Sequence, residues 1–180
     1  MALPKEDIYT IEDIYALPDG ERAELIDGQI YYMAPPSRKH QKLSGEIFGI
    51  IREYIRSNHG ACEVYTAPFA VYLDEHTNTY VEPDISVICD PKKLDDRGCI
   101  GAPDWIVEIV SPSSKQMDYY KKLFKYRTAG VREYWVVDPD KNLILVYNFE
   151  QGTSEQYTLS DKVKAGIYEN LVIDFRNIRL

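Results

Sequence analysis

Two carboxylates in apolar surroundings are the residues of this chain best suited to chemistry. Asp84 follows Pro83 in the segment 80–88, and Glu108 lies inside the apolar run 105–110. Both segments have the β-branched content of buried strands. An unpaired charge buried there is costly, so each carboxylate is expected to have a cationic partner. If the two strands lie side by side, the pair forms a cradle for a hard divalent cation, which indicates a metal-dependent hydrolase.

Each carboxylate also has a plainer interpretation. On the two-residue period of a strand, Asp84 shares one face with Glu82 and Ser86, and it could be a surface or turn residue. Glu108 is harder to explain in that way, because apolar residues flank it on both sides.

The elements that would position these residues begin with a short helix and a hairpin. A threonine cap and early acidic residues predict a helix from Thr10 to Tyr15. Asp27-Gly28, between the short segments 23–26 and 29–33, is a strong signal for a two-residue hairpin turn.

The rest of the chain alternates between helical and strand patterns. Apolar spacing predicts helices over Ser37–Ser57 and from Ser113 or Ser114 to Ala129, the second stopped by Gly130. A loop is expected over 90–101 and a turn at 75–78. Strands are expected over 63–67, 69–73, 80–88, 105–110, 133–137 and 143–148. The pattern predicts a single α/β or α+β domain over residues 1–180, with helices around a mixed sheet.

Charge and composition narrow the class of protein. The net charge of −8 argues against indiscriminate coating of nucleic acid. Residues 113–132, however, hold six Lys and Arg side chains and a single acidic residue, Asp118. This run could bind phosphates, or it could be a solvated helix face.

Cysteine usage and hydropathy predict the compartment. No apolar run is long enough to cross a bilayer, and the start lacks the pattern of a secretion signal. Three widely spaced cysteines, Cys62, Cys89 and Cys99, predict reduced thiols without a disulfide or a structural zinc site. We therefore expect a cytoplasmic protein with no membrane partner.

Several short segments, taken in order, resemble one known family. They are Glu24–Gly28, Met33–Ser37 with His40, Pro83-Asp84, Val107–Ser113, Asp118 with Lys122 and Tyr126, Ala129–Val131, and Glu133–Pro139. In this order and spacing they resemble the Uma-two type of restriction endonucleases, a branch of the PD-(D/E)xK nuclease superfamily. The resemblance runs from about Tyr9 to about Tyr147.

The resemblance implies a fold, a metal and a substrate. The fold is a restriction-endonuclease-like core with a central mixed sheet flanked by helices, plus an added N-terminal helix and β-hairpin. Asp84, Glu108 and the backbone carbonyl of Ile109 would bind Mg²⁺, with Mn²⁺ possible, and DNA would be cut. The superfamily lysine usually stands two positions after the glutamate, where this chain has Val110; the family branch points instead to Lys122 on the next helix.

Simple geometry is consistent with Lys122. A strand climbs roughly 13 Å over the four residues after Glu108, and a helix folding back from Ser114 descends about 12 Å by Lys122. Asp118, one turn earlier, could orient the ammonium. The helical wheel leaves a solvated Lys122 open, and Lys121 is the alternative. An apolar stripe lies almost opposite Lys122, formed by Met117, Tyr120 and Phe124.

Two further residues are secondary candidates. Glu24 opens the first hairpin and could add a carboxylate, although it could also be an exposed strand residue. His40 stands near the start of the second helix, where it could meet a phosphate, although a lone histidine is more often structural. Tyr134 and Trp135 are expected to pack in the sheet rather than to stack on bases.

The favoured function is a Mg²⁺-dependent endonuclease that hydrolyses phosphodiester bonds of DNA, with Asp84, Glu108 and Lys122 as its catalytic residues. A homodimer is expected on symmetry grounds, because many such enzymes cut two strands with two subunits. One alternative is a non-catalytic nuclease-like protein that binds nucleic acid or a partner, derived from a mobile element. Another is a metal-dependent hydrolase acting on a different substrate, since fold alone does not fix substrate.

Overall fold

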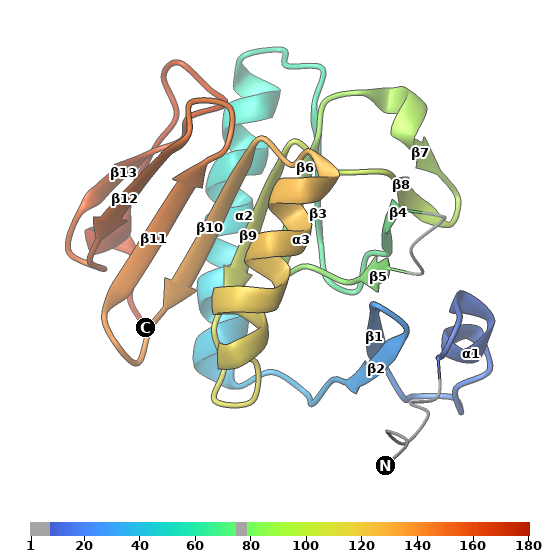
Figure 1. Cartoon of the computed structure of the whole chain (residues 1–180). Coiled ribbons are helices and arrows are strands. Elements are labelled where there is room, and N and C mark those ends of the chain that lie inside the picture. The colour runs from blue at the N-terminus through green and yellow to red at the C-terminus, as the bar shows by residue number, and fades with distance from the viewer. Residues whose placement is uncertain (1–7, 75–78) are drawn as a thin grey trace.

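The computed structural model describes residues 8–74 and 79–180, so the turn expected at 75–78 lies outside the described residues. Within them, two mixed six-stranded sheets form the scaffold (Figure 1). The first has the strand order β2 (Gln29–Tyr32), β1 (Ala23–Ile26), β5 (Thr79–Val81), β4 (Val71–Asp74), β8 (Gly98–Ile100) and β7 (Leu94–Asp95). The second has the order β12 (Thr153–Tyr157), β11 (Leu143–Asn148), β10 (Glu133–Asp138), β9 (Trp105–Ile109), β6 (Ile85–Ile88) and β3 (Glu63–Thr66).

Helices lie beside both sheets. Helix α1 (Ile11–Tyr15) contacts β1 of the first sheet, and α2 (Arg38–Ser57) packs on the second. The strands β9 and β10 are parallel, and the helical run 115–129 connects them; we call this run the crossover helix. It contains a π-helical turn, Met117–Lys121, followed by α3 (Lys122–Ala129). A small sheet of β13 (Lys162–Lys164) and β14 (Val172–Asp174) follows. The predicted α+β class, with helices flanking mixed sheets, is confirmed.

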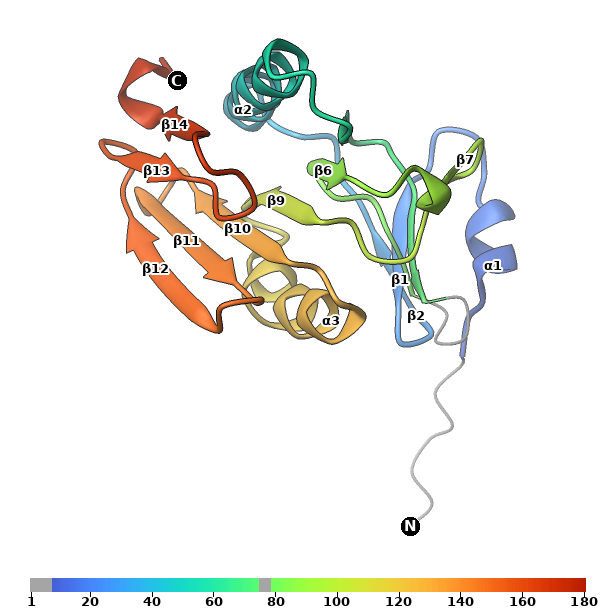
Figure 2. The ribbon, with the colours of Figure 1, turned by 90° about the horizontal axis from the view of Figure 1, so that it is seen from above.

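Strand alternation decides which residues face which helix. The helices α2 and α3 lie on opposite faces of the second sheet (Figure 2). Trp105, Val107 and Ile109 of β9 join the core cluster that contains the buried side of α2. The intervening Ile106 belongs to the opposite cluster, which contains Tyr126 of α3. Glu108 alternates with the first set, so its side chain lies on the face covered by the crossover helix.

Both predicted long helices are present. Ser37 caps α2 by accepting a hydrogen bond of 3.2 Å from the backbone N–H of His40. The buried stripe of α2 consists of Leu43, Ile47, Ile51 and Ile55. The crossover helix ends at Ala129, and Gly130 follows in the left-handed conformation with φ of 95°, which favours glycine.

The prediction of one continuous strand over 80–88 was wrong. Strand β5 ends at Val81 and β6 begins at Ile85, and they belong to different sheets. Pro83 has no N–H to donate to a ladder, and the backbone N–H groups on either side bond carboxylates instead of a neighbouring strand. Asp84 therefore lies at the passage between the sheets rather than within a regular strand face.

The prediction of a plain loop over 90–101 was also wrong. A 3₁₀ turn, Pro91–Lys93, leads into β7 and β8, and β8 pairs in parallel with β4. Gly98 makes this pairing possible, because a Cβ there would lie 2.2 Å from the carbonyl oxygen of Ala70. The sequence signal was weak because these strands are only two and three residues long.

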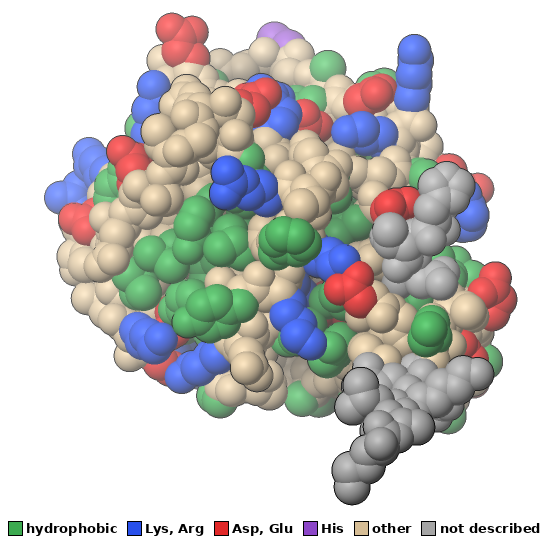
Figure 3. Space-filling view, in the orientation of Figure 1, with side chains coloured by type: hydrophobic (Ala, Val, Ile, Leu, Met, Phe, Trp, Pro, Cys, Tyr) green, Lys and Arg blue, Asp and Glu red, His purple; other side chains and the backbone are tan. Residues whose placement is uncertain are grey.

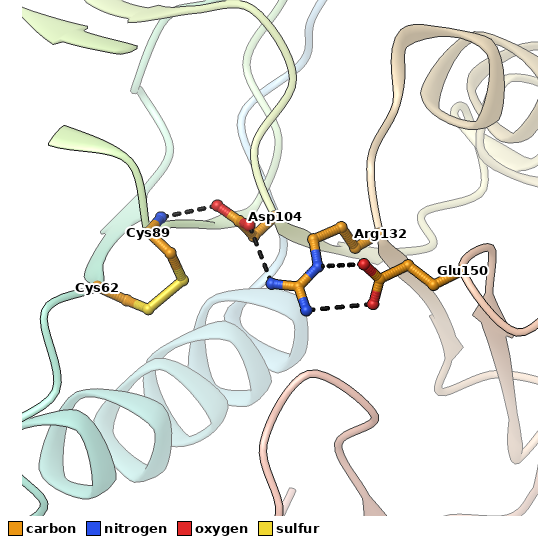
Figure 4. Close-up of a disulfide and its surroundings, with 5 residues drawn as sticks. All are labelled: Cys62, Cys89, Asp104, Arg132 and Glu150. Atoms are coloured by element: carbon orange, nitrogen blue, oxygen red, sulfur yellow. Dashed lines mark hydrogen bonds and ion pairs between the residues drawn. A yellow bond between two sulfur atoms is a disulfide. The ribbon is translucent and has the colours of Figure 1, made fainter. Parts of the chain in front are cut away.

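The cysteine prediction was wrong as well. Cys62 and Cys89 form a disulfide, whereas Cys99 is a buried free thiol (Figure 4). The antiparallel register of β3 and β6 pairs Glu63 with Ile88, so the two cysteines face each other one residue beyond that pair. The two cysteines are 27 positions apart in the sequence, and the pairing of β3 with β6 brings them together.

An ion-pair chain lies beside this disulfide (Figure 4). The backbone N–H of Cys89 donates to Oδ2 of Asp104 over 2.7 Å, and the other oxygen of Asp104 pairs with Arg132 at 3.1 Å. Arg132 also makes two hydrogen bonds to the carboxylate of Glu150.

Among the described residues, no helix is long and apolar enough to cross a membrane.

Candidate active site

A cleft of about 730 Å³ is lined by residues from both sheets, from α2 and from the crossover helix. Seven predicted site residues line it: Glu24, His40, Asp84, Glu108, Ile109, Asp118 and Lys122. The structure thus brings together side chains that lie up to 98 positions apart, as 122 minus 24, in the sequence. The predicted contact between β9 and the crossover helix brings Glu108, Asp118 and Lys122 together. The passage between the two sheets places Asp84 beside them.

The centre of the site is a buried ion pair. Nζ of Lys122 lies 2.8 Å from Oε1 of Glu108. The two residues are 4% and 3% exposed, so Lys122 is not the solvated lysine that the helical wheel had left open. The alternative, Lys121, is exposed and its ammonium contacts the hydroxyl of Tyr31 instead.

Two more carboxylates surround the same ammonium. Oε1 of Glu24 lies 2.9 Å from Nζ of Lys122, and Oδ1 of Asp118 lies 3.6 Å from it. Glu24 also accepts a hydrogen bond of 3.0 Å from the backbone N–H of Glu82, which fixes it against the passage between the sheets. Asp118 stands one turn before Lys122, as expected.

Asp84 is held through a single oxygen. Its Oδ2 accepts a hydrogen bond of 2.7 Å from the backbone N–H of Ile109 and lies 3.1 Å from Nε2 of His40. The backbone N–H of Asp84 lies 3.4 Å from Oε2 of Glu108, so the main chain of Asp84, rather than its carboxylate, contacts Glu108. Ile109 is thus next to Asp84, and the role of its carbonyl as a ligand stays a prediction.

The site carries more negative than positive charge. Burial raises the pKa of Glu108 to about 8; the Lys122 ammonium opposes this shift, and the other carboxylates add to it. Burial likewise raises the pKa of Asp118 to about 6. Burial disfavours the charged form of Lys122, but the surrounding carboxylates raise its pKa well above the ordinary value, so it stays an ammonium. Burial lowers the pKa of His40, but the hydrogen bond to Asp84, the negative charge of Asp84 and smaller contributions from nearby groups together outweigh burial and raise this pKa.

The donor set fits a hard divalent cation. Carboxylate oxygens are the ligands that Mg²⁺ and Mn²⁺ prefer, and an excess of negative charge favours their entry. Oδ1 of Asp118 is buried without a hydrogen-bond partner, although the Lys122 ammonium lies 3.6 Å from it, so this oxygen keeps its hydrogen-bonding capacity. Among the described residues, no group of three or more His, Cys, Asp or Glu side chains is arranged as a complete metal site, so the two-carboxylate set would need backbone or water ligands.

Tyr126 stood among the residues that carry the family resemblance, but sequence analysis gave it no role, and the structure places it beside Glu108. Its hydroxyl donates a hydrogen bond of 2.7 Å to Oε1 of Glu108, and the residue is fully buried. The available signal was its spacing: Tyr126 follows Lys122 by four residues, on the same helical face.

The basic run 113–132 is only partly free to bind phosphates. Lys122 lies inside the site, Lys125 pairs with Asp27, and Arg132 pairs with Asp104 and Glu150. Tyr134 and Trp135 are fully buried, which confirms that they pack in the sheet.

Mixed sheets flanked by helices, around a cleft of acidic side chains and a buried lysine, define a nuclease-like fold. A solved structure from Anabaena variabilis, described as a putative nuclease belonging to DUF820, has this fold with a TM-score of 0.77. The match covers 94% of this chain and 96% of that chain at 22% identity.

The chain belongs to the Uma2 family, described as "Putative restriction endonuclease", which matches residues 11–172. This confirms the family predicted from the motifs. A curated relative from Synechocystis sp., "Uncharacterized protein slr1290", is 32% identical over 98 residues. That match covers 54% of this chain and only half of the relative's length.

Proposed function

We propose that this protein is a divalent-metal-dependent endonuclease that hydrolyses phosphodiester bonds of DNA. Asp84 and Glu108 would bind Mg²⁺ or Mn²⁺ together with the carbonyl of Ile109, and Lys122 would act beside them. The observation that carries the proposal is the 2.8 Å contact between Lys122 and Glu108 in a cleft that also contains Asp84. Family and fold support the nuclease class; the metal and the DNA substrate are our proposal.

The bound ion would polarise the scissile phosphate and acidify a water molecule. The chain's own residues supply the remaining requirements. Lys122 is held charged by three carboxylates, so it can stabilise negative charge that develops on the phosphate without having to be reoriented. The backbone N–H of Ile109 and the imidazole of His40 fix Asp84 through Oδ2, and neither bond uses Oδ1.

His40 has a second possible use at the same place. It lines the cleft and stands in the first turn of α2, with a buried Nδ1 that makes no hydrogen bond among the described residues. We propose that it positions Asp84 and contacts the phosphate next to the scissile one. Glu24 and Asp118 would serve mainly to hold Lys122.

Cleavage assays with matched variants test this function. Asp84→Asn and Glu108→Gln should abolish Mg²⁺-dependent and Mn²⁺-dependent cleavage of DNA, whereas Glu46→Gln, on the exposed side of α2, should cleave as the parent does. A crystal soaked in Mn²⁺ should show anomalous density between Asp84 and Glu108. Cleavage that survives in both site variants would reject the assignment. Nucleic-acid binding without any cleavage would favour the non-catalytic alternative.

We also propose that the active form is a homodimer, since one cleft contains one set of site residues and a duplex has two strands. The outer strand β12 has exposed residues along most of its length and is a candidate edge for pairing. Sedimentation at several protein concentrations tests this: a single monomeric species at all of them, also with DNA present, would contradict it.

A further inference from the structure

The exposed face of the crossover helix has an unusual composition for this acidic protein. Its solvent-exposed residues after the first turn are Tyr120, Lys121, Phe124, Arg127 and Thr128. Tyr120 is 72% and Phe124 is 64% exposed. No acidic side chain is among them, because the helix's single acid, Asp118, is buried in the site. The face therefore combines aromatic rings with cations on a chain of net charge −8.

This face borders the cleft at two points. Met117 of the same helix lines the cleft, and the ammonium of Lys121 contacts the hydroxyl of Tyr31, which also lines it. Tyr120 and Phe124 lie on the outward side of the helix, away from the buried Lys122. Tyr147 and Phe149 of the neighbouring β11 region are half-buried beside the helix, with their rings stacked at 6.2 Å. Hydrophobic side chains gather over α3 and β11, with Lys and Arg side chains around them (Figure 3).

We propose that this aromatic and basic face binds the unpaired bases of a nucleic-acid strand that enters the cleft, so that the preferred substrate has a single-stranded stretch beside the scissile bond. The inference rests on the proposed nuclease function. Aromatic rings stack on bases of any sequence, and neighbouring cations contact the phosphates. Tyr120 and Phe124 would be the stacking residues, and Lys121 and Arg127 the phosphate contacts.

The charges on this face favour a single nucleic-acid strand over a duplex or a second copy of the chain. A long track of free cations would be needed to follow the two backbones of a duplex, but Lys125 and Arg132 are already paired with acids of the chain. A second copy of the chain docked face to face would bring Lys121 and Arg127 close to their own copies. The helix itself exposes no acid to offset them, and Asp27 of the first hairpin turn is already paired with Lys125.

Binding without cleavage tests the inference. Fluorescence anisotropy in EDTA would measure the affinity of labelled oligothymidylate and of a duplex of equal length. The double variant Tyr120→Ala/Phe124→Ala should lose roughly tenfold to a hundredfold in affinity for the single strand, and little for the duplex. Tyr120→Phe should bind as the parent does, because stacking needs the ring and not the hydroxyl. Tyr15→Ala, another exposed tyrosine on α1, is the matched control and should also bind unchanged.

The outcomes separate this inference from the proposed function. An unchanged single-strand affinity in the double variant overturns the inference, even if the protein cuts DNA. Loss of single-strand affinity in a protein that cuts nothing supports the face while rejecting the nuclease. If the double variant instead converts a dimer to a monomer and binds the single strand as before, the face belongs to a second copy and the inference is wrong.

Discussion

The hydroxyl of Tyr126 donates a hydrogen bond of 2.7 Å to Oε1 of Glu108. The same oxygen accepts from Lys122, so two donors from one helix hold one oxygen of the carboxylate. With Oε1 fixed in this way, Oε2 is left on the side of Asp84, whose backbone N–H lies 3.4 Å from it. Tyr126 therefore sets the orientation of a carboxylate that we propose binds the metal.

Replacing Tyr126 with phenylalanine should weaken metal binding while leaving the fold intact. Outer-shell partners of metal ligands commonly contribute tenfold or more to affinity, so we expect Mn²⁺ to bind roughly ten times more weakly. The lost bond should also lower the free energy of unfolding by about 1–2 kcal/mol. Titration calorimetry and denaturant unfolding would measure the two effects.

The matched control for Tyr126 is Tyr134→Phe. Tyr134 is equally buried, but its hydroxyl donates to the backbone carbonyl of Asp118 and not to a proposed ligand. This control should lose stability with little change in Mn²⁺ affinity. Equal losses of affinity in both variants would show that the Tyr126 effect is structural only.

Lys122→Met should be strongly destabilising in the metal-free protein. The substitution leaves the acidic groups of Glu24, Glu108 and Asp118 buried without their cation, and breaking such a pair costs about 3–5 kcal/mol. Lys121→Met, at the adjacent but exposed position, should change the free energy of unfolding by less than about 0.5 kcal/mol. Adding Glu108→Gln to Lys122→Met should recover part of the loss. Similar unfolding curves for both lysine variants would refute the account of Lys122 as a buried partner.

The sequence predicted the site residues of β9 and the crossover helix better than the contribution of the first sheet. Glu108 was predicted from its apolar surroundings and Lys122 from the family resemblance, and the rises of a strand and a helix were consistent with both lying at the same level. The burial of Lys122 was not predictable, since it depends on Glu24, which reaches it from the other sheet. No local pattern marks two sheets that meet at a proline, and this is why the strand over 80–88 was misassigned.

The cysteines show the same limit in another form. Local spacing predicted free thiols, whereas the register of β3 and β6 opposes Cys62 and Cys89. Register is a non-local property, set by the packing of whole strands. In contrast, the long helices, the first hairpin and the fold class followed from local periodicity and caps, and all were confirmed.

Metal binding should strengthen as pH rises towards about 8. Burial raises the pKa of Asp118 to about 6 and that of Glu108 to about 8, so in the metal-free protein each carboxyl is protonated at pH values below its own pKa. A divalent cation must displace those protons, and its affinity therefore increases with pH and levels off above about 8. Calorimetry in buffers of different ionisation enthalpy would count the protons released.

The same pKa shifts determine whether the stability of the metal-free protein rises or falls with pH. A carboxyl whose pKa is higher in the folded state binds more protons when folded, so the stability it contributes is full at low pH and is lost as pH rises through the folded value. We expect the free energy of unfolding to fall from about pH 4 to about pH 8: Asp118 contributes between its ordinary pKa of 3.8 and about 6, and Glu108 between 4.5 and about 8. Asp118→Asn should therefore flatten only the part of the curve below about pH 6. A stability that rises across this window in the metal-free protein would contradict the assigned shifts.

Removing the disulfide should destabilise the fold without affecting the cleft. Cys62 and Cys89 close a loop over 27 positions, which in the chain-entropy account is worth about 3.5 kcal/mol. Neither cysteine lines the cleft, so Cys62→Ser/Cys89→Ser should lose that stability in denaturant unfolding and keep the affinity for Mn²⁺. Dithiothreitol should lower the stability of the parent but not that of the double variant. If the denatured, unreduced protein reacts with thiol reagent at all three cysteines, the bond is absent and this prediction fails.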